Sequence, residues 1–405
     1  MPDGSVVVTA KFGRKRDTIL AAATEVLNHE GVKGMTLAAV AGKVGLITTS
    51  VTYYFKKKED LAAACFMGGI ARIEALAAEA AQQPTPQARL YALLDLYLAM
   101  KGRIRAGDEP PIPVFSDIRA LTGEHRLQVV EAYLGLFRAV RDLLGAGPDH
   151  GRAPDTAFTQ MVLEQLHWMQ AWLNRYPTED FPALRDRMHD LLMHGLGADG
   201  AAWAPRRLDP AAIGPDAGGG QRETFLLAAT RLINQQGYRG ASVDKISAEL
   251  KVTKGSFYHH HSAKDDVVVS CFRRSFQAVR NAQDAALTLD ADAWTRLSSA
   301  AAALMEFQLS PQGPLLRSSA LSALPEGMRV EMMALSNQLS ERWARMISDG
   351  IAEGSVRPVD PFIAAQMFNA GLNAAADLPV LLGGVTADKL VDLYARPMLT
   401  GLRPQ

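Results

Sequence analysis

Apolar residues recur at helical spacing along almost the whole chain, and no stretch shows the alternation typical of a half-buried strand. Near the N-terminus, Ile19, Ala23 and Leu27 share one face of a predicted helix. This helix ends at Glu30-Gly31, where glycine tolerates the left-handed cap conformation. Thr36 is placed to cap a second short helix. The pattern predicts an all-α protein whose first part contains a helix-turn-helix.

Longer helices are predicted beyond this point. In the first half we expect helices at about 48–54, 58–82, 87–105, 124–144, 155–176 and 181–196. In the second half, a helical stretch is predicted to continue through Arg280. It is followed by predicted helices at 294–309, 328–353, 360–382 and 387–402. Between the halves, residues 197–220 are rich in Gly, Pro and Ala, which is typical of a linker.

The second half repeats the first. Arg16 to Phe66 aligns without a gap on Arg222 to Phe272, each residue with the one 206 positions later. Gly195-Leu196 and Gly401-Leu402 keep the same offset, so the repeated unit is the whole half. We therefore expect a first helix-turn-helix domain (1–66), a first helical body (67–196), a linker (197–220), a second helix-turn-helix domain (221–272) and a second body (273–405). We call the helix-turn-helix domains the first and second heads.

Charge is unevenly distributed although the formal net charge is zero. Residues 11–66 carry nine basic against five acidic side chains, and residues 222–274 carry the same numbers. Each head is thus basic and the bodies are acidic, a pattern that favours one-sided contact with a polyanion.

Composition and targeting signals place the protein among soluble globular chains. Hydrophobic residues make up 48% and charged residues 21% of the sequence. Cys65 and Cys271 occupy equivalent positions, which fits duplicated cores better than a disulfide or metal site. The N-terminus has no signal-peptide pattern, and no apolar run approaches the length of a membrane span, so we expect a cytoplasmic protein without membrane contact.

The third helix of the second head carries the side chains that a DNA-reading helix needs. Hydroxyl and imidazole groups can reach base edges in the major groove, while lysines, tyrosine and helix N-terminal amides hold phosphates. Ser262 and Asp265 would form a capping box for the helix that follows. The predicted DNA contacts are Ser242, Thr253, Lys254, Gly255, Ser256, Tyr258, His259, His260 and Lys264.

The first head offers a different set of candidate DNA contacts. Ile47 replaces the capping Thr253, and Thr52 stands where Tyr258 stands, so its hold on phosphate is weaker. We expect the basic segment before Arg16 to compensate by reaching into the adjacent minor groove. The predicted contacts are Thr36, Thr48, Thr49, Ser50, Thr52, Tyr53, Tyr54 and Lys58.

Both heads resemble the TetR family of one-component bacterial transcriptional regulators. The resemblance rests on Ala228-Ala229-Thr230 through Gly237-Tyr238, on Ser242 to Ser247, on Val252 to His260, and on Lys264-Asp265-Asp266. The first head carries the same frame from Ala22-Ala23 to Lys58-Glu59-Asp60-Leu61. His261 departs from the family's core phenylalanine, which Phe55 retains.

The resemblance implies a regulator that binds a double-stranded DNA operator and answers to a small effector. Family members are homodimers joined by a four-helix bundle, and this chain already holds both halves. We therefore predict an intramolecular pseudo-dimer in which Asp155 to Leu196 packs on Asp360 to Leu402, with further dimerisation of chains left open. Two unlike recognition helices imply an imperfect or asymmetric palindrome.

Aromatic residues in the bodies are either core or the lining of a pocket for a small hydrophobic or aromatic effector. The candidates are Tyr97, Phe115, Trp168, Trp172, Phe307 and Trp343.

Other chemistry finds little support. Three consecutive histidines, His259 to His261, point about 100° apart on a helix and cannot converge on a metal. Gly195 to Gly200 matches a dinucleotide fingerprint in letters but follows a helix and enters a linker, where the fingerprint requires a strand before it. We expect no enzyme activity, cofactor or metal. The open alternative is a one-headed DNA-binding, architectural or partner-binding protein whose first head is degenerate.

Overall fold

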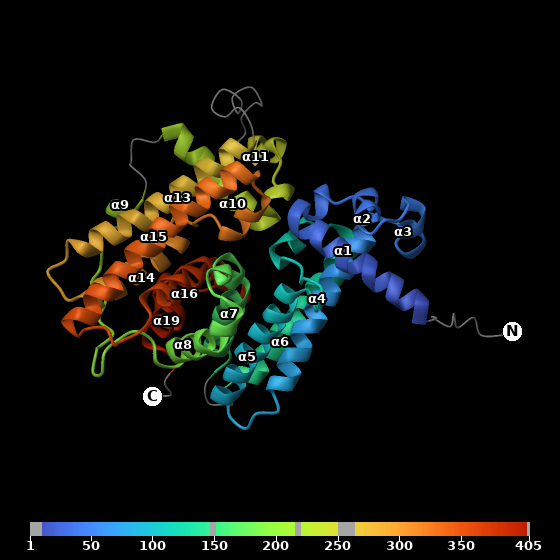
Figure 1. The fold of residues 1–405 in the computed structure, drawn as a ribbon. Helices are drawn as coiled ribbons and strands as arrows, with labels where there is room; N and C mark the ends of the chain where they lie inside the picture. The colour runs from blue at the N-terminus through green and yellow to red at the C-terminus, as the bar shows by residue number, and fades with distance from the viewer. Residues whose placement is uncertain (1–9, 146–150, 215–219, 250–263, 403–405) are drawn as a thin grey trace. The chain divides into compact units, whose positions relative to one another are not determined.

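The computed structural model describes residues 10–145, 151–214, 220–249 and 264–402 (Figure 1). These residues are organised as helices joined by turns, and within them the β-type pairing is one isolated antiparallel bridge between Gly197 and Val356. They form two compact units. The first comprises Met1–Ala75 and Met100–Leu136, and the second comprises Leu76–Ala99 and Phe137–Gln405. The all-α prediction is confirmed.

The helices of the first half lie close to their predicted positions. Gly31 interrupts the first helix with φ 66°, at the glycine where its end was expected. The elements are α1 Ala10–Gly34, α2 Leu37–Lys43, α3 Thr48–Tyr54, α4 Lys58–Ala80, α5 Pro86–Ala106, the 3-10 helix η1 Phe115–Ala120, α6 Gly123–Leu144, α7 Arg152–Trp168, η2 Met169–Ala171, η3 Leu173–Arg175, η4 Thr178–Asp180 and α8 Phe181–His194.

One expectation about the N-terminal segment is wrong. The basic run Lys11 to Arg16 does not precede the first helix as an arm, because α1 begins at Ala10 and includes it. Lysine and arginine are good helix formers. Phe12 also packs on the ring of Tyr54 with 4.5 Å between centroids, which holds this first turn against α3.

The second half repeats this order with more interruptions. Its elements are α9 Pro210–Ile213, α10 Gly220–Gly240, α11 Val243–Glu249, α13 Lys264–Leu287, α14 Ala293–Leu309, η6 Ser318–Ala323, α15 Glu326–Glu353, α16 Pro361–Ala374, η7 Ala375–Asp377, α17 Leu378–Leu381, α18 Ala387–Leu390, the π-helix η8 Val391–Ala395 and α19 Arg396–Thr400.

Continuous helices expected over 155–176, 360–382 and 387–402 are broken into short pieces. Pro379 and Pro397 lack the amide that would bond to the carbonyl four residues earlier, so the regular hydrogen-bond ladder cannot continue through them. The 3-10 turn η7 and the π-turn η8 lie directly before these prolines.

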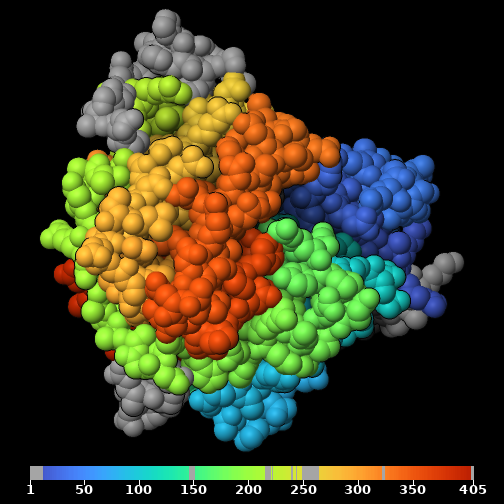
Figure 2. Space-filling model, turned by 60° about the vertical axis from the view of Figure 1, so that its left-hand side comes forward, coloured from blue at the N-terminus to red at the C-terminus, as the bar shows by residue number. Residues whose placement is uncertain are grey.

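Within the second unit, the final helices of the two halves pack together as predicted. Figure 2 shows the green α7–α8 segment lying against the orange segment of the second half. The amide of Leu196 donates to Leu399 O at 2.7 Å, and the amide of Leu402 donates to Leu192 O at 3.1 Å. Gly195 and Gly401 meet backbone to backbone. These glycines occupy equivalent positions in the two halves, so the same point of each half takes part in the contact, as in the interface of a symmetric dimer.

Arg357 also joins the two halves. The Arg357 guanidinium contacts Asp190 Oδ2 at 2.7 Å and donates to Gly195 O at 2.7 Å. Its amide donates to Leu196 O at 2.9 Å, beside the bridge of Gly197 with Val356. The segment after α8 is therefore fixed to the second half from its first residues.

Residues 197–214 have the composition of a linker but pack along the second half. Trp294 Nε1 donates to Ala202 O at 2.8 Å, and the amide of Arg206 donates to Ser299 Oγ at 2.8 Å. Ile213 of α9 is buried. Residues 197–214 are thus held against the second half at several points.

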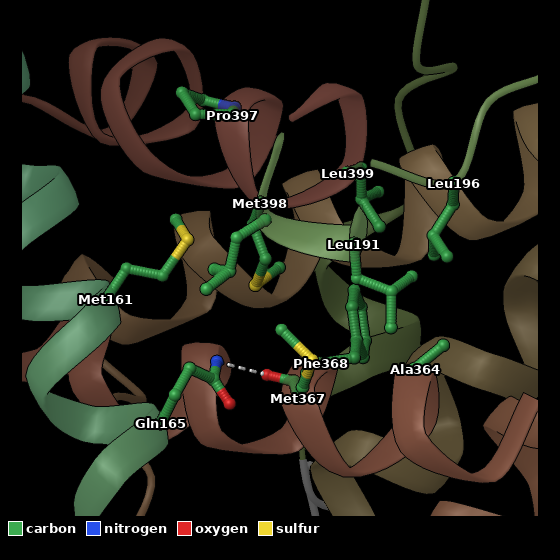
Figure 3. A pocket seen from close by; sticks show the side chains of 11 residues that line it. Met161, Gln165, Leu191, Leu196, Ala364, Met367, Phe368, Pro397, Met398 and Leu399 are labelled. Carbon is green, nitrogen blue, oxygen red and sulfur yellow. Dashed lines mark hydrogen bonds between the residues drawn. The ribbon is translucent and has the colours of Figure 1, made fainter. Parts of the chain in front are cut away.

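A small cavity lies between the halves (Figure 3). It is lined mainly by apolar side chains, with Gln165 donating to Met367 O at 2.9 Å at one wall. Its volume of about 20 Å³ is room for a water molecule. A cavity of this volume is too small for an effector molecule.

One helix departs from the expectation that no apolar run approaches membrane length. The 23 residues of α4 have a mean hydropathy of 1.5 in their most apolar window, long and apolar enough to cross a bilayer by composition. Half of that window is buried inside the protein. Leu61, Phe66 and Ile73 are completely or almost completely buried, so α4 is a core helix.

Candidate nucleic-acid interface

The helix-turn-helix of the first head is built as its sequence predicts. Thr36 Oγ1 accepts a hydrogen bond from the amide of Ala39 at 3.0 Å and so caps α2. Gly45 takes φ 66° in the turn. Val40 of α2 and Val51 of α3 are fully buried, which fixes the face that α3 presents outward.

The outward face of α3 carries most of the predicted contacts. Thr48, Thr49 and Tyr53 are exposed, Tyr53 by 68%, while Ser50, Thr52 and Tyr54 are half-buried. Thr52 Oγ1 donates to Thr48 O, so its hydroxyl is engaged within the helix. Ile47 makes no side-chain cap, as expected from its apolar side chain. Figure 1 shows α3 at the rim of the first unit.

An aromatic cluster that sequence reasoning missed joins α1 to α3. Phe12 lies 6.1 Å from Tyr53 and 4.5 Å from Tyr54, measured between ring centroids. The Arg16 guanidinium lies over the ring of Phe55 at 5.6 Å. The basic first turns of α1 are therefore packed against α3 and the residue that follows it. The signal was a lone aromatic residue within a basic run.

The start of α4 connects this head to α6. Lys58 Nζ donates to Lys33 O at 2.7 Å. Asp60 Oδ2 accepts from the amide of Lys57, and its other oxygen lies 2.8 Å from His125 Nε2. The hydrogen bond with His125 lowers the pKa of Asp60. Because His125 lies in the first turn of α6, movement of α6 bears directly on the N-terminal end of α4.

An asparagine in each head grips the loop before the next 3-10 helix. Asn28 Nδ2 donates to Ile112 O, and its Oδ1 accepts from the amide of Val114, both at 2.9 Å. Asn234 makes the same pair of bonds to Leu315 O and the amide of Arg317. The repeat alignment paired the two asparagines but gave no sign of this clamp, since each partner lies more than 80 residues away along the chain.

The second head is described only in part. Ser242 Oγ accepts from the amide of Lys245 at 3.3 Å, the counterpart of the Thr36 cap. Lys264 Nζ lies 4.3 Å from the ring centroid of Tyr238, whose hydroxyl bonds to Asp265. The other predicted contacts lie outside the described residues: Thr253, Lys254, Gly255, Ser256, Tyr258, His259 and His260, together with the capping Ser262.

The six effector candidates are packed in cores, and none lines the cavity of Figure 3. Tyr97 is fully buried and donates to Leu166 O at 2.8 Å. Trp343 stacks edge-on against Phe368 at 4.5 Å. Phe115 belongs to the first unit and the other five to the second. The remaining candidates, Trp168, Trp172 and Phe307, are half-buried, buried and buried.

Comparison with known proteins gives matches to both heads. The family model described as "Bacterial regulatory proteins, tetR family" matches residues 19–65 and 225–271. The chain is 32% identical over 89 residues to the Transposon Tn10 TetC protein of Escherichia coli, which covers 20% of this chain and 43% of TetC. It is 29% identical over 140 residues to the HTH-type transcriptional repressor DhaR of Mycobacterium sp. (strain GP1), covering 34% of this chain and 70% of DhaR.

Each of two similar solved structures covers somewhat less than half of this chain. The TetR family transcriptional regulator PfmR from Thermus thermophilus is 22% identical, with a TM-score of 0.38, and covers 44% of this chain and 99% of its own. AibR, solved with isovaleryl coenzyme A and operator DNA, is 20% identical, with a TM-score of 0.36, and covers 45% of this chain and 100% of its own.

Proposed function

Since the chain is a TetR-family regulator of transcription with two tandem units, we propose that it is a ligand-responsive repressor whose two unlike heads bind one asymmetric operator. A regulator of this family binds DNA and is not an enzyme. The observation that carries the proposal is the backbone contact of Gly195 with Gly401. One chain supplies both sides of that interface, and hence both heads of a dimer.

The asymmetry of the operator follows from the difference between the heads. The first presents Thr48, Thr49 and Thr52 where the second has Lys254, Gly255 and Tyr258. Side chains of different reach and hydrogen-bonding capacity select different base pairs in the major groove. Each half-site of the operator would then have its own sequence.

Response to a ligand requires that the ligand bind one arrangement of body and head better than another. The contacts that could carry this difference are present at the first head, where Asp60 bonds to His125 and Asn28 grips the loop at 112–114. The proposed effector is small and hydrophobic or aromatic. Tyr97, Phe115, Trp168, Trp172, Phe307 and Trp343 remain its candidate contacts.

The alternative is a protein that reads DNA with its second head alone. The observation in its favour is that Ile47, the N-cap residue of α3, makes no side-chain cap. Lys58→Ala and Lys264→Ala, made separately, distinguish the two functions by titration of the operator at several salt concentrations. A chain with two working heads loses affinity in both variants, and its log–log salt slope falls by about one for each lost phosphate contact. A one-headed protein responds only to Lys264→Ala.

The control is Arg345→Ala, which removes an exposed positive charge from α15 of the second body. It should leave the salt slope unchanged. A perfectly symmetric footprint, or sedimentation that shows two chains with four engaged heads on each operator, would contradict the pseudo-dimer arrangement.

A further inference from the structure

The loop before η6, together with η6 itself, packs into the core cluster of the second head. Leu316 and Leu321 are buried in this cluster with residues of α10, α11 and α13. Asn234 of α10 donates to Leu315 O at 2.8 Å and accepts a hydrogen bond from the amide of Arg317 at 3.1 Å. These contacts hold the loop against the second head.

On its other side, the same loop is bonded to the helices that end the second half. The Arg317 guanidinium donates two hydrogen bonds, one to each carboxylate oxygen of Asp377, which lies in η7 directly after α16. The amide of Ser318 donates to Asn373 Oδ1 of α16 at 3.1 Å. The loop therefore lies between the second head and α16, and Arg317 takes part in the contacts on both sides.

The ion pair between Arg317 and Asp377 is largely withdrawn from water. The two side chains are 14% and 27% exposed, so solvent and salt screen their attraction less than that of a surface pair. Because the guanidinium is planar, its two parallel bonds fix the direction of the contact as well as its length. Such a pair sets the orientation of the two elements that it joins.

The first half cannot form this ion pair at the equivalent place. Asn28 accepts a hydrogen bond from the amide of Val114, just as Asn234 accepts one from the amide of Arg317. These two equivalent bonds place Val114 where the second half has Arg317. A valine side chain carries no charge and donates no hydrogen bond, so the ion pair is particular to the second half.

We propose that Arg317 is a positioning residue for DNA binding, which holds the second head in one orientation on α16 through its ion pair with Asp377. A helix-turn-helix must present its recognition helix to the major groove in a defined orientation. A head that can tilt on its body loses part of its binding free energy when DNA orders it. This effect on DNA binding rests on the proposed repressor function, whereas the positioning of the head does not.

Amide hydrogen exchange of the full chain, followed by mass spectrometry, tests the positioning of the head. Arg317→Gln and Asp377→Asn should each raise exchange severalfold in α10 and α11, because the head is then held less firmly. The peptides of α8 and α19, where the two halves meet, should keep their exchange rates. An unchanged rate in α10, or a rise of equal size in all these helices, would overturn the positioning role, since the pair would then contribute only to overall stability.

Operator titration of the two single variants and the double variant tests the effect on DNA binding. Each single variant should weaken operator binding about tenfold, a size typical of coupled neighbouring residues. The double variant should bind no more weakly, because either change alone already breaks the pair. Losses that add in the double variant would overturn the proposal. The log–log salt slope should stay unchanged, and a slope lower by about one would make Arg317 a direct phosphate contact instead.

Asp284→Asn is the matched control, because it breaks another ion pair of the second body, that of Asp284 in α13 with Arg342 in α15. It should change neither exchange in α10 nor operator affinity, and losses equal to those of Asp377→Asn would overturn the proposal. Arg317→Lys keeps the charge without the two parallel bonds and should lose less affinity than Arg317→Gln. A chain that binds no operator in any form would overturn the proposed repressor function, and exchange in α10 would then decide the positioning role alone.

Discussion

The contact between Gly195 and Gly401 is open to a direct test by Gly401→Ala. Gly401 has φ 75°, and a Cβ added to it would lie 2.5 Å from Gly195 N and 2.6 Å from Met193 O. Both atoms belong to the backbone, so no side-chain rotation relieves the overlap. The two halves would have to separate locally.

The loss of folding stability in Gly401→Ala has two parts. An alanine at positive φ costs about 1–2 kcal/mol. Overpacking at a close contact adds about 1–3 kcal/mol. Gly354→Ala isolates the first part, because Gly354 has φ 84° and no atom lies within 4 Å of its added Cβ. The expected losses in free energy of unfolding are about 2–5 kcal/mol for Gly401→Ala and about 1–2 kcal/mol for Gly354→Ala.

Urea unfolding followed by tryptophan fluorescence measures these losses in the relevant part of the molecule. All five tryptophans, Trp168, Trp172, Trp203, Trp294 and Trp343, lie in the second unit, so their emission is insensitive to separate unfolding of the first. If both variants lose the same free energy within about 0.5 kcal/mol, a typical margin for surface substitutions, the contact does not hold the halves together.

Two further substitutions test the second unit with the same fluorescence assay. Burial opposes ionisation of Asp190, but hydrogen bonds from Arg357 and His194 outweigh it and lower the pKa of this carboxyl group. The Arg357–Asp190 ion pair therefore stabilises the fold above about pH 4, near the pKa of an unfolded aspartate. This stabilisation is lost as the pH falls through the lowered pKa of the folded state. Arg357→Ala should lower the free energy of unfolding at pH 7 and make it decrease less steeply below pH 4. An unchanged decrease below pH 4 would contradict this. Tyr394→Phe removes a fully buried hydroxyl that has no hydrogen-bond partner among the described residues, so we expect it to stabilise by about 1 kcal/mol; a loss of that size would reveal a partner.

Local signals in the sequence predicted the head well. The hydroxyl of Thr36 sits where a cap was expected, and α3 covers the predicted residues, because caps and short amphipathic helices depend on neighbours within a few positions. Phe12 was not predicted to fasten α1 to α3. The contact depends on tertiary packing, so the neighbours of Phe12 in the sequence do not indicate which aromatic ring it packs against.

The repeat also concealed a difference between the halves. Asn28 and Asn234 are 206 residues apart, yet the residues they grip, Ile112 and Leu315, are only 203 apart. The second half is therefore three residues shorter between its head and this loop. Since the offset returns to 206 at Gly195 and Gly401, a comparison of the two ends alone gave no sign of the change. The structure reveals it through two equivalent pairs of hydrogen bonds.

Because the two halves are fused in one chain, a contact can exist on one side of the bundle and be absent from the other. The symmetry of a homodimer forbids this. Trp168 ends α7 and its counterpart, Ala374, ends α16. Trp168 packs against the core cluster that the second head shares with η6 and α15, and its Nε1 donates to Gln366 Oε1 at 3.2 Å. In a homodimer every such contact would occur twice and would couple the heads equally. Here an indole of the first half packs against that shared cluster, while the equivalent position of the second half, Ala374, has only a methyl group. The two halves of this bundle therefore differ at a pair of equivalent positions, as the two halves of a homodimer cannot.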